Sequence, residues 1–248
     1  MDLNQGILNH EVDLFIPCFI DQIFPETGMN MARVLEKAGL KVRYNDNQTC
    51  CGQMAFNAGY WDEAKAMGEK FLKDFNHSRF VIGPSASCVG YIRNHYHTLF
   101  HNSAYHLEYK QLIKRIFEFT DFLVNVVHCT DVGSRFDAVV TYHDSCAALR
   151  DYGIREEPRL LLSHVRGLEL REMDHSGECC GFGGTFSVKF EPISVAMAEQ
   201  KVHHAIDTGA SYIVSTDASC LMHQWGYIQK HQLPIKVIHI ADVLASGW

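Results

Sequence analysis

Eight cysteines, four in each half of the chain, are the residues whose spacing could do chemistry. They are Cys18, Cys50, Cys51 and Cys88 in the first half and Cys146, Cys179, Cys180 and Cys220 in the second half. Each half has a single cysteine, a Cys-Cys-Gly triplet and a last single cysteine, and corresponding cysteines lie 128 to 132 positions apart. A ninth cysteine, Cys129, stands outside this pattern. Four thiols that recur at matched spacing predict a metal site or a pair of disulfides in each half.

Composition favours metal ligands over disulfides. The chain has 248 residues, 47% of them hydrophobic, and is much longer than the small secreted domains that depend on disulfides. Its start lacks the apolar stretch of a signal peptide, and no segment approaches the ~20 apolar residues of a membrane span. We therefore expect a cytoplasmic protein whose thiols stay reduced. A net charge of −7 without runs of Lys or Arg argues against nucleic acids and anionic membranes as partners.

Strand patterns and helix patterns alternate, and they match between the halves as the cysteines do. The matched strand segments are residues 14–18 with 139–146, 40–44 with 168–172, 79–83 with 211–215, and 115–119 with 236–240. Helical spacing of apolar residues lies between them, for example in the stretch that Pro192 opens and Gly209 ends. The prediction is an α/β fold of two pseudo-symmetric repeats, each a small parallel sheet flanked by helices. The expected domains are residues 1–127 and 128–248.

The predicted strands bring the thiols of each half to one place. Each single cysteine directly follows a strand, and each Cys-Cys-Gly triplet follows another strand closely, so all four thiols should meet at the carboxyl edge of the sheet. Cys88 and Cys220 also precede expected helices, whose amino-terminal dipole favours a thiolate. Glycines beside the thiols allow close approach of backbone N–H groups to a cluster. We expect an iron–sulfur cluster rather than a single zinc ion, because adjacent cysteines point in different directions and seldom chelate one ion. Zinc remains the alternative, particularly in protein purified in air.

The doubled pattern resembles a known family. The segments Cys50-Cys51-Gly52-Gln53, Tyr142-His143-Asp144-Ser145-Cys146, Cys179-Cys180-Gly181-Phe182-Gly183-Gly184 and Thr216-Asp217-Ala218-Ser219-Cys220 carry the resemblance. They are similar to those of the cysteine-rich CCG family, which includes the cysteine-rich subunit of heterodisulfide reductase and the iron–sulfur subunit of glycolate oxidase. Length and two-repeat layout are most similar to the lactate-utilisation proteins of the LutA/YkgE type. The resemblance implies that the eight cysteines bind iron–sulfur clusters in an oxidoreductase subunit that transfers electrons. It also implies that LutB- and LutC-like partner subunits act with this subunit to oxidise L-lactate, a small 2-hydroxy acid, to pyruvate.

One departure from the relatives bears on the cluster type. In the cysteine-rich subunit of heterodisulfide reductase the last ligand of each half belongs to a Cys-x₂-Cys pair, whereas this chain has Tyr91 and His223 at the corresponding positions. With four thiols a half, we expect a 4Fe–4S cluster or a site with one ligand that is not a thiolate. His223 is the candidate for that ligand in the second half, with a surface histidine as the alternative.

Two further functions stay open at this point. A zinc-binding scaffold and a subunit similar to heterodisulfide reductase or glycolate oxidase would use the same cysteines. His143 and Asp144, beside Cys146 at a strand exit, are candidates for a role in the site, against a packed histidine and a turn-capping aspartate. Asp121 and Asp242, at matched positions after the last strand of each half, are predicted to cap helices. The glycine-rich stretch fits no nucleotide-binding motif.

Overall fold

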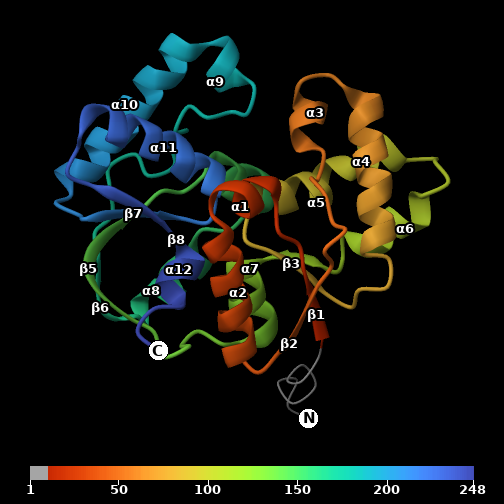
Figure 1. Ribbon diagram of the computed structural model, residues 1–248, viewed down its shortest axis with the longest axis horizontal. Coiled ribbons are helices and arrows are strands. Elements are labelled where there is room, and N and C mark those ends of the chain that lie inside the picture. The colour runs from red at the N-terminus through yellow and green to blue at the C-terminus, as the bar shows by residue number, and fades with distance from the viewer. Residues whose placement is uncertain (1–10) are drawn as a thin grey trace. The chain divides into compact units, whose positions relative to one another are not determined.

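The computed structural model describes residues 11–248 and divides the chain after Cys129 into two compact units (Figure 1). In the described residues each unit contains one four-stranded parallel sheet with helices packed on it. The mixed α/β fold with two repeats, predicted from the sequence, is therefore confirmed.

The first unit has the strand order β2-β1-β3-β4. Its strands are β1 (Glu11–Leu14), β2 (Lys41–Tyr44), β3 (Val81–Gly83) and β4 (Ile116–Glu118). Its α-helices are α1 (Cys18–Ile23), α2 (Pro25–Lys37), α3 (Gln53–Asn57), α4 (Trp61–Asp74), α5 (Ala86–Phe100), α6 (His106–Leu112) and α7 (Phe119–Asp121), which a π-helical segment, Phe122–Val127, continues. The direction of the chain across the sheet reverses between β1 and β3, which are hydrogen-bonded neighbours.

The second unit repeats this order as β6-β5-β7-β8. Its strands are β5 (Arg135–Tyr142), β6 (Arg166–Leu170), β7 (Tyr212–Ser215) and β8 (Lys236–His239). Its α-helices are α8 (Glu156–Ser163), α9 (Phe186–Lys189), α10 (Glu191–Asp207), α11 (Ala218–His231) and α12 (Ile240–Leu244), and a π-helical segment, Ala147–Tyr152, follows β5. Corresponding strands thus pair in the same way in both units.

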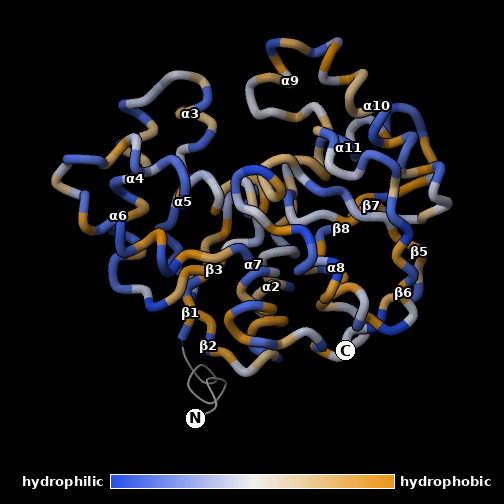
Figure 2. The backbone as a smooth tube through the Cα atoms, turned by 180° about the vertical axis from the view of Figure 1, so that it is seen from behind, coloured by the Kyte–Doolittle hydropathy of each residue, from blue (hydrophilic) through white to orange (hydrophobic). Residues whose placement is uncertain are grey.

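Burial explains why these segments form strands and helices. β3 in the first sheet and β7 in the second are short and buried, as expected of central strands covered on both faces, and Figure 2 shows hydrophobic colour along β5. Helix α10 begins at Glu191, so that Pro192 lies in its first turn, where the missing N–H costs nothing. Ala198, Val202 and Ala205 lie on the buried face of this helix, and the last two share a hydrophobic cluster with Ile213 of β7.

The helix caps after the last strand of each unit differ from the prediction. Asp121 and Asp242 lie inside the first turns of α7 and α12, and the caps are Glu118 and His239. Both caps sit at the end of the preceding strand, so the strand runs directly into the helix. The predicted caps therefore lie three residues too far along the chain in each half.

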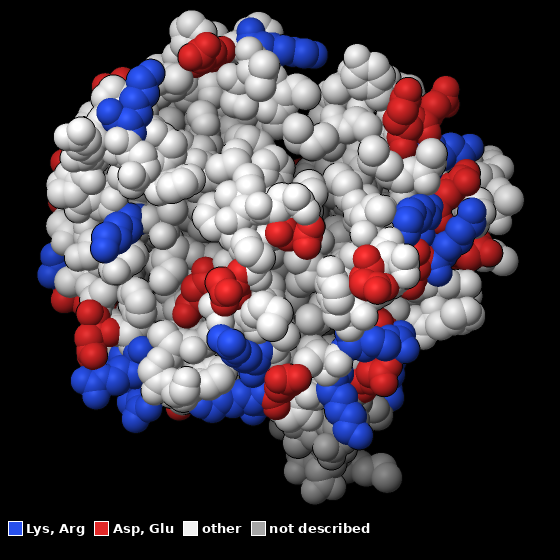
Figure 3. All heavy atoms as spheres, viewed as in Figure 1, with Lys and Arg blue, Asp and Glu red and all other residues white. Residues whose placement is uncertain are grey.

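Charged side chains of both signs are mixed on the surface. On the face that Figure 3 shows, basic and acidic side chains are interspersed rather than gathered into a basic stripe of the kind that binds nucleic acids. Among residues 11–248, no helix is both long enough and apolar enough to cross a bilayer.

Candidate metal-binding sites

The first and last cysteines of each half follow two neighbouring central strands. Cys18 opens α1 after β1, and Cys88 lies in the first turn of α5 after β3. In the second unit Cys146 follows β5, and Cys220 lies in the first turn of α11 after β7. Because the strands of each pair are parallel neighbours, both thiols lie at the carboxyl edge of the sheet, where such folds bind ligands.

The first thiol quartet, which we define as Cys18, Cys50, Cys51 and Cys88, converges. The Sγ atoms of Cys18 and Cys50 are 3.9 Å apart. Hydrogen bonds also link Cys50 with Cys51 and Cys51 with Cys88. Cys51 and Cys88 are buried, and the other two thiols are half-buried.

The second thiol quartet, Cys146, Cys179, Cys180 and Cys220, has the same connections. Cys146 contacts Cys179, Cys179 contacts Cys180, and Cys180 contacts Cys220. All nine cysteines of the chain lie in the described part, and each is a free thiol. The structure therefore brings together within each unit the four cysteines that the sequence singles out.

One thiol in each quartet is strongly acidified by its neighbours. The hydrogen bond from Cys18 lowers the pKa of Cys50 to about 3, and that from Cys146 lowers the pKa of Cys179 to about 2. The donors change in the other direction, because giving up the proton would break the same bond: the pKa values of Cys18 and Cys146 are raised. Each quartet therefore holds at least one thiolate, the form in which cysteine binds metals.

The glycine of each Cys-Cys-Gly triplet shapes the turn that presents the thiols. Gly52 has φ +91° and Gly181 has φ +90°, a left-handed conformation that other residues seldom adopt. In this conformation the N–H of Gly52 donates to Cys50 Sγ, and the N–H of Gly181 donates to Cys179 Sγ, each at 3.4 Å. Such N–H···S hydrogen bonds stabilise a thiolate and would tune a bound cluster.

His143 lies against the second thiol quartet. A nitrogen of its ring and the Sγ atoms of Cys180 and Cys220 lie within 4.8 Å of one another. The side chain is fully buried, and neither ring nitrogen has a hydrogen-bond partner in residues 11–248. Burial, followed by the nearby charge of Lys201, lowers the pKa of His143 to about 3. The imidazole is therefore neutral at ordinary pH, as metal binding requires.

Charged and polar side chains fix the loop between His143 and Cys146. Asp144 is buried and accepts two hydrogen bonds from the Arg159 guanidinium, at 2.9 and 2.8 Å, and Arg159 also binds Glu172. The Ser145 hydroxyl donates to the carboxylate of Asp217, the residue before α11. These contacts hold the residues on both sides of His143 and Cys146 in place. Asp144 thus anchors the loop through its buried ion pair with Arg159.

Comparison with known proteins decides the family. The model of the cysteine-rich domain, CCG, matches residues 12–93 and 140–223, which contain both thiol quartets. This chain belongs to the cysteine-rich CCG family. Within that family it belongs to the group named lactate utilization protein A. "Lactate utilization protein A 2" of Bacillus cereus (strain AH820) is 38% identical over 238 residues, or 96% of this chain and 98% of the relative. "Lactate utilization protein A" of Geobacillus kaustophilus (strain HTA426) is 40% identical over 234 residues, or 94% of this chain and 98% of the relative.

One solved structure supports the fold. A crystal structure of a hypothetical protein from Helicobacter pylori superimposes with a TM-score of 0.58 over 98% of this chain and 53% of its own. Since the two sequences are 12% identical, this likeness concerns the fold alone.

His223 and Tyr91, where disulfide-reductase members of the CCG family have a further cysteine, differ in their surroundings. His223 Nε2 lies 3.1 Å from the Ser194 hydroxyl, which in turn donates to the carbonyl of Gly181. Tyr91 is buried, and its ring lies 5.3 Å from that of Phe56. The sequence analysis named His223 as a candidate ligand. In the structure its Nε2 contacts the Ser194 hydroxyl, whereas the imidazole of His143 lies beside the thiols of the second quartet.

Lys201 is a residue near the CCG thiols that the sequence analysis missed. It is 1% exposed, lies on the buried face of α10, and is close enough to Cys179 and Cys180 for their charges to act on its ammonium group. Its Nζ donates to the carbonyls of His175 and Ser176, at 2.6 and 3.0 Å. Burial lowers its pKa. A signal was present in the sequence, because Lys201 falls three residues after Ala198, in register with the apolar stripe.

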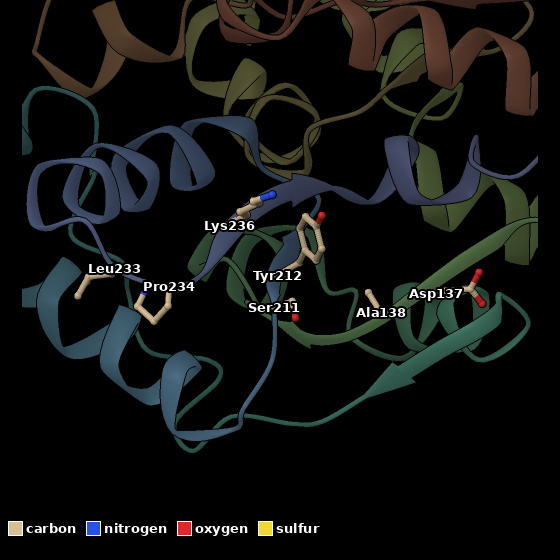
Figure 4. A pocket seen from close by; sticks show the side chains of 7 residues that line it. All are labelled: Asp137, Ala138, Ser211, Tyr212, Leu233, Pro234 and Lys236. Atoms are coloured by element: carbon tan, nitrogen blue, oxygen red, sulfur yellow. The ribbon is translucent and has the colours of Figure 1, made fainter.

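A pocket in the second unit lies away from the thiols. It has a volume of about 500 Å³ and is lined by residues at the amino-terminal parts of β5, β7 and β8, among them Asp137, Tyr212 and Lys236 (Figure 4). The second thiol quartet follows the opposite, carboxyl ends of β5 and β7. Binding in this pocket would not contact the CCG cysteines.

Proposed function

We propose that this chain is the iron–sulfur electron-transfer subunit of a complex that oxidises L-lactate to pyruvate in the reducing cytoplasm. The observation that carries the proposal is the pair of thiol quartets, one in each CCG repeat, each with buried thiols and an acidified cysteine. The lactate substrate rests on the names of the full-length relatives. Each repeat, residues 1–127 and 128–248, would hold one 4Fe–4S cluster.

The chemistry divides between this chain and its partners. Oxidation of lactate to pyruvate removes two electrons and two protons, the protons from the C2 carbon and its hydroxyl. A cluster supplies one-electron transfer. The eight cysteines of the quartets would hold the clusters, and the N–H groups of Gly52 and Gly181 would donate to ligand sulfurs. LutB- and LutC-like subunits would supply the remaining redox groups and the electron acceptor.

A zinc-binding scaffold is the second candidate, and one distance favours it. Two thiolates on a tetrahedral zinc, each about 2.3 Å from the ion, lie a little under 4 Å apart. Cys18 and Cys50 are 3.9 Å apart. A cluster places each thiolate on a different iron and needs a wider spacing, which the glycine-containing loops would have to provide by opening.

Anaerobic purification followed by iron, sulfide and zinc analysis separates the two functions. We expect iron and sulfide in equal amounts in the parent protein, about half of both in Cys180→Ser, and the parent amounts in Cys129→Ser, whose thiol is outside the quartets. Lactate-dependent reduction of the clusters in the reconstituted complex should disappear in the Cys180 variant. Zinc without sulfide in the parent would refute the electron-transfer function.

A further inference from the structure

The two units differ in the first residue after the strand that leads to the first cysteine of each quartet, β1 in the first unit and β5 in the second. The Phe15 N–H donates to the Ile82 carbonyl at 2.9 Å, and the His143 N–H donates to the Val214 carbonyl at 2.8 Å. Ile82 and Val214 are themselves equivalent, because each pairs with the last residue of the neighbouring strand, β1 or β5. Phe15 and His143 therefore occupy the same backbone position in the two repeats.

A second pair of equivalent positions lies on the second helix after each Cys-Cys-Gly triplet, α4 in the first unit and α10 in the second. A Cβ on Gly52 would lie 3.1 Å from the carbonyl oxygen of Ala64, and a Cβ on Gly181 would lie 2.5 Å from that of Ser194, so the two glycines face equivalent positions of α4 and α10. Seven residues further along the two helices stand Phe71 and Lys201. These two residues are thus equivalent as well.

The two pairs fill the same place with opposite chemistry. In the first unit the rings of Phe15 and Phe71 meet edge to face, with centroids 4.8 Å apart, and both side chains are buried. In the second unit the pair is His143 and Lys201, equally buried. The positions that carry two aromatic rings in the first unit thus carry two polar side chains in the second.

A buried imidazole without a partner needs a reason, because buried polar groups are nearly always hydrogen-bonded. Both nitrogens of His143 lack a partner within the described chain, and one of them lies within 4.8 Å of the Sγ atoms of Cys180 and Cys220. We propose that the imidazole of His143 takes the place of one thiolate as a ligand of the metal group at the second thiol quartet, so that this site combines three thiolates with an imidazole while the first uses thiolates alone. The inference rests on the proposed function for the presence of a metal group, but not on whether that group is a cluster or zinc.

The two sites then differ in their electronic properties. A neutral imidazole donates less negative charge than a thiolate, and the buried ammonium of Lys201 stabilises an added electron nearby. If the groups are clusters, the second has the higher reduction potential. Lys201 acts as a positioning and electrostatic residue here, since its Nζ is bound to backbone carbonyls.

The test is made on the full-length chain, purified anaerobically with ¹⁵N-labelled histidine. Pulsed electron resonance of the reduced protein should show nitrogen coupling to one cluster. The coupling should vanish in His143→Phe, which copies the residue of the first unit, and in His143→Gln, which keeps a polar side chain of similar length. It should remain in His223→Ala, the matched control. Lys201→Met should keep the coupling and lower the potential of one cluster only.

Each outcome decides the inference. Coupling that persists in both His143 variants, or that is lost in His223→Ala alone, overturns it. If the parent contains zinc and no sulfide, the proposed function fails and cobalt(II) replaces zinc in the same variants. An absorption spectrum that changes in the His143 variants but not in His223→Ala then supports the inference, and an unchanged spectrum overturns it. A parent that binds no metal refutes both.

Discussion

Replacing Gly181 by alanine should disrupt the second metal site through the backbone alone. A Cβ at this position would lie 2.5 Å from the Ser194 carbonyl oxygen and 2.9 Å from Met197 Cβ, both on α10. Real Cβ atoms do not approach a carbonyl oxygen so closely, so the triplet and the helix must move apart. The same movement weakens the hydrogen bond from the Gly181 N–H to Cys179, whose length is now 3.4 Å.

Gly153→Ala is the matched control. Gly153 has φ +93°, close to the +90° of Gly181, but a Cβ there would meet no described atom within 4 Å. The control thus measures the backbone cost, about 1–2 kcal/mol. Gly181→Ala adds overpacking of about 1–3 kcal/mol, for a total near 2–5 kcal/mol. Gly52→Ala, with the nearest oxygen at 3.1 Å, should fall between the two.

Both glycines of the main comparison belong to the second unit, so one unfolding transition reports on both. We would measure urea unfolding of the reduced, metal-free variants, and metal content after reconstitution. Gly181→Ala should lose about half the metal, and Gly153→Ala should keep all of it. Equal unfolding free energies for the two variants would refute the steric argument, and full metal content in Gly181→Ala would refute the role of the turn.

Two further predictions concern buried charges. Burial raises the pKa of Glu118 to about 8, so the folded protein keeps a proton that the unfolded chain releases near its ordinary pKa of 4.5. The contribution of Glu118 to the unfolding free energy is therefore full below pH 4.5 and is lost as the pH rises to about 8. The loss is at most about 1.4 kcal/mol per pH unit. In urea unfolding at a series of pH values, a Glu118→Gln variant should lack this decrease of the unfolding free energy with pH. Arg159→Lys removes the paired hydrogen bonds from the guanidinium to the Asp144 carboxylate. It should cost about 2–4 kcal/mol in unfolding free energy and weaken metal binding. Arg135→Lys, in an exposed ion pair, should leave the unfolding free energy nearly unchanged. Similar losses in both variants would contradict the importance of the buried guanidinium–carboxylate pair.

The sheets and the thiol positions could be predicted because two independent signals agreed. Periodicity marked the strands, and the repeat showed which segments of the two halves correspond. The family resemblance was confirmed for the same reason, since the cysteine spacing is specific. Convergence of Cys18 with Cys88 followed from parallel strands ending at one edge, a geometric rule that does not depend on the rest of the sequence.

Residues whose environment is set by tertiary packing were harder to predict. Lys201 is a charged residue on a helix, and composition alone places such a residue in water. His143 was a candidate from its position, but only burial showed that both ring nitrogens lack partners. His223 was chosen from its spacing to Cys220, and spacing could not reveal that Ser194 would engage it. Comparing the two repeats position by position, Phe15 with His143 and Phe71 with Lys201, would have drawn attention to these residues.

The exchange of Phe15 and Phe71 for His143 and Lys201 also bears on the stability of each unit before any metal is bound. The aromatic pair contributes apolar burial to the first unit as soon as that unit folds. In the second unit the same positions hold His143 and Lys201 instead of an aromatic pair, and the buried imidazole has no hydrogen-bond partner in the described residues. If His143 binds a metal as proposed, newly made chains would depend on that metal mainly for the integrity of the second unit, which would open more often and be degraded first when the metal is scarce. The amount of protein in the cell would then follow the metal available to it, without any separate regulator.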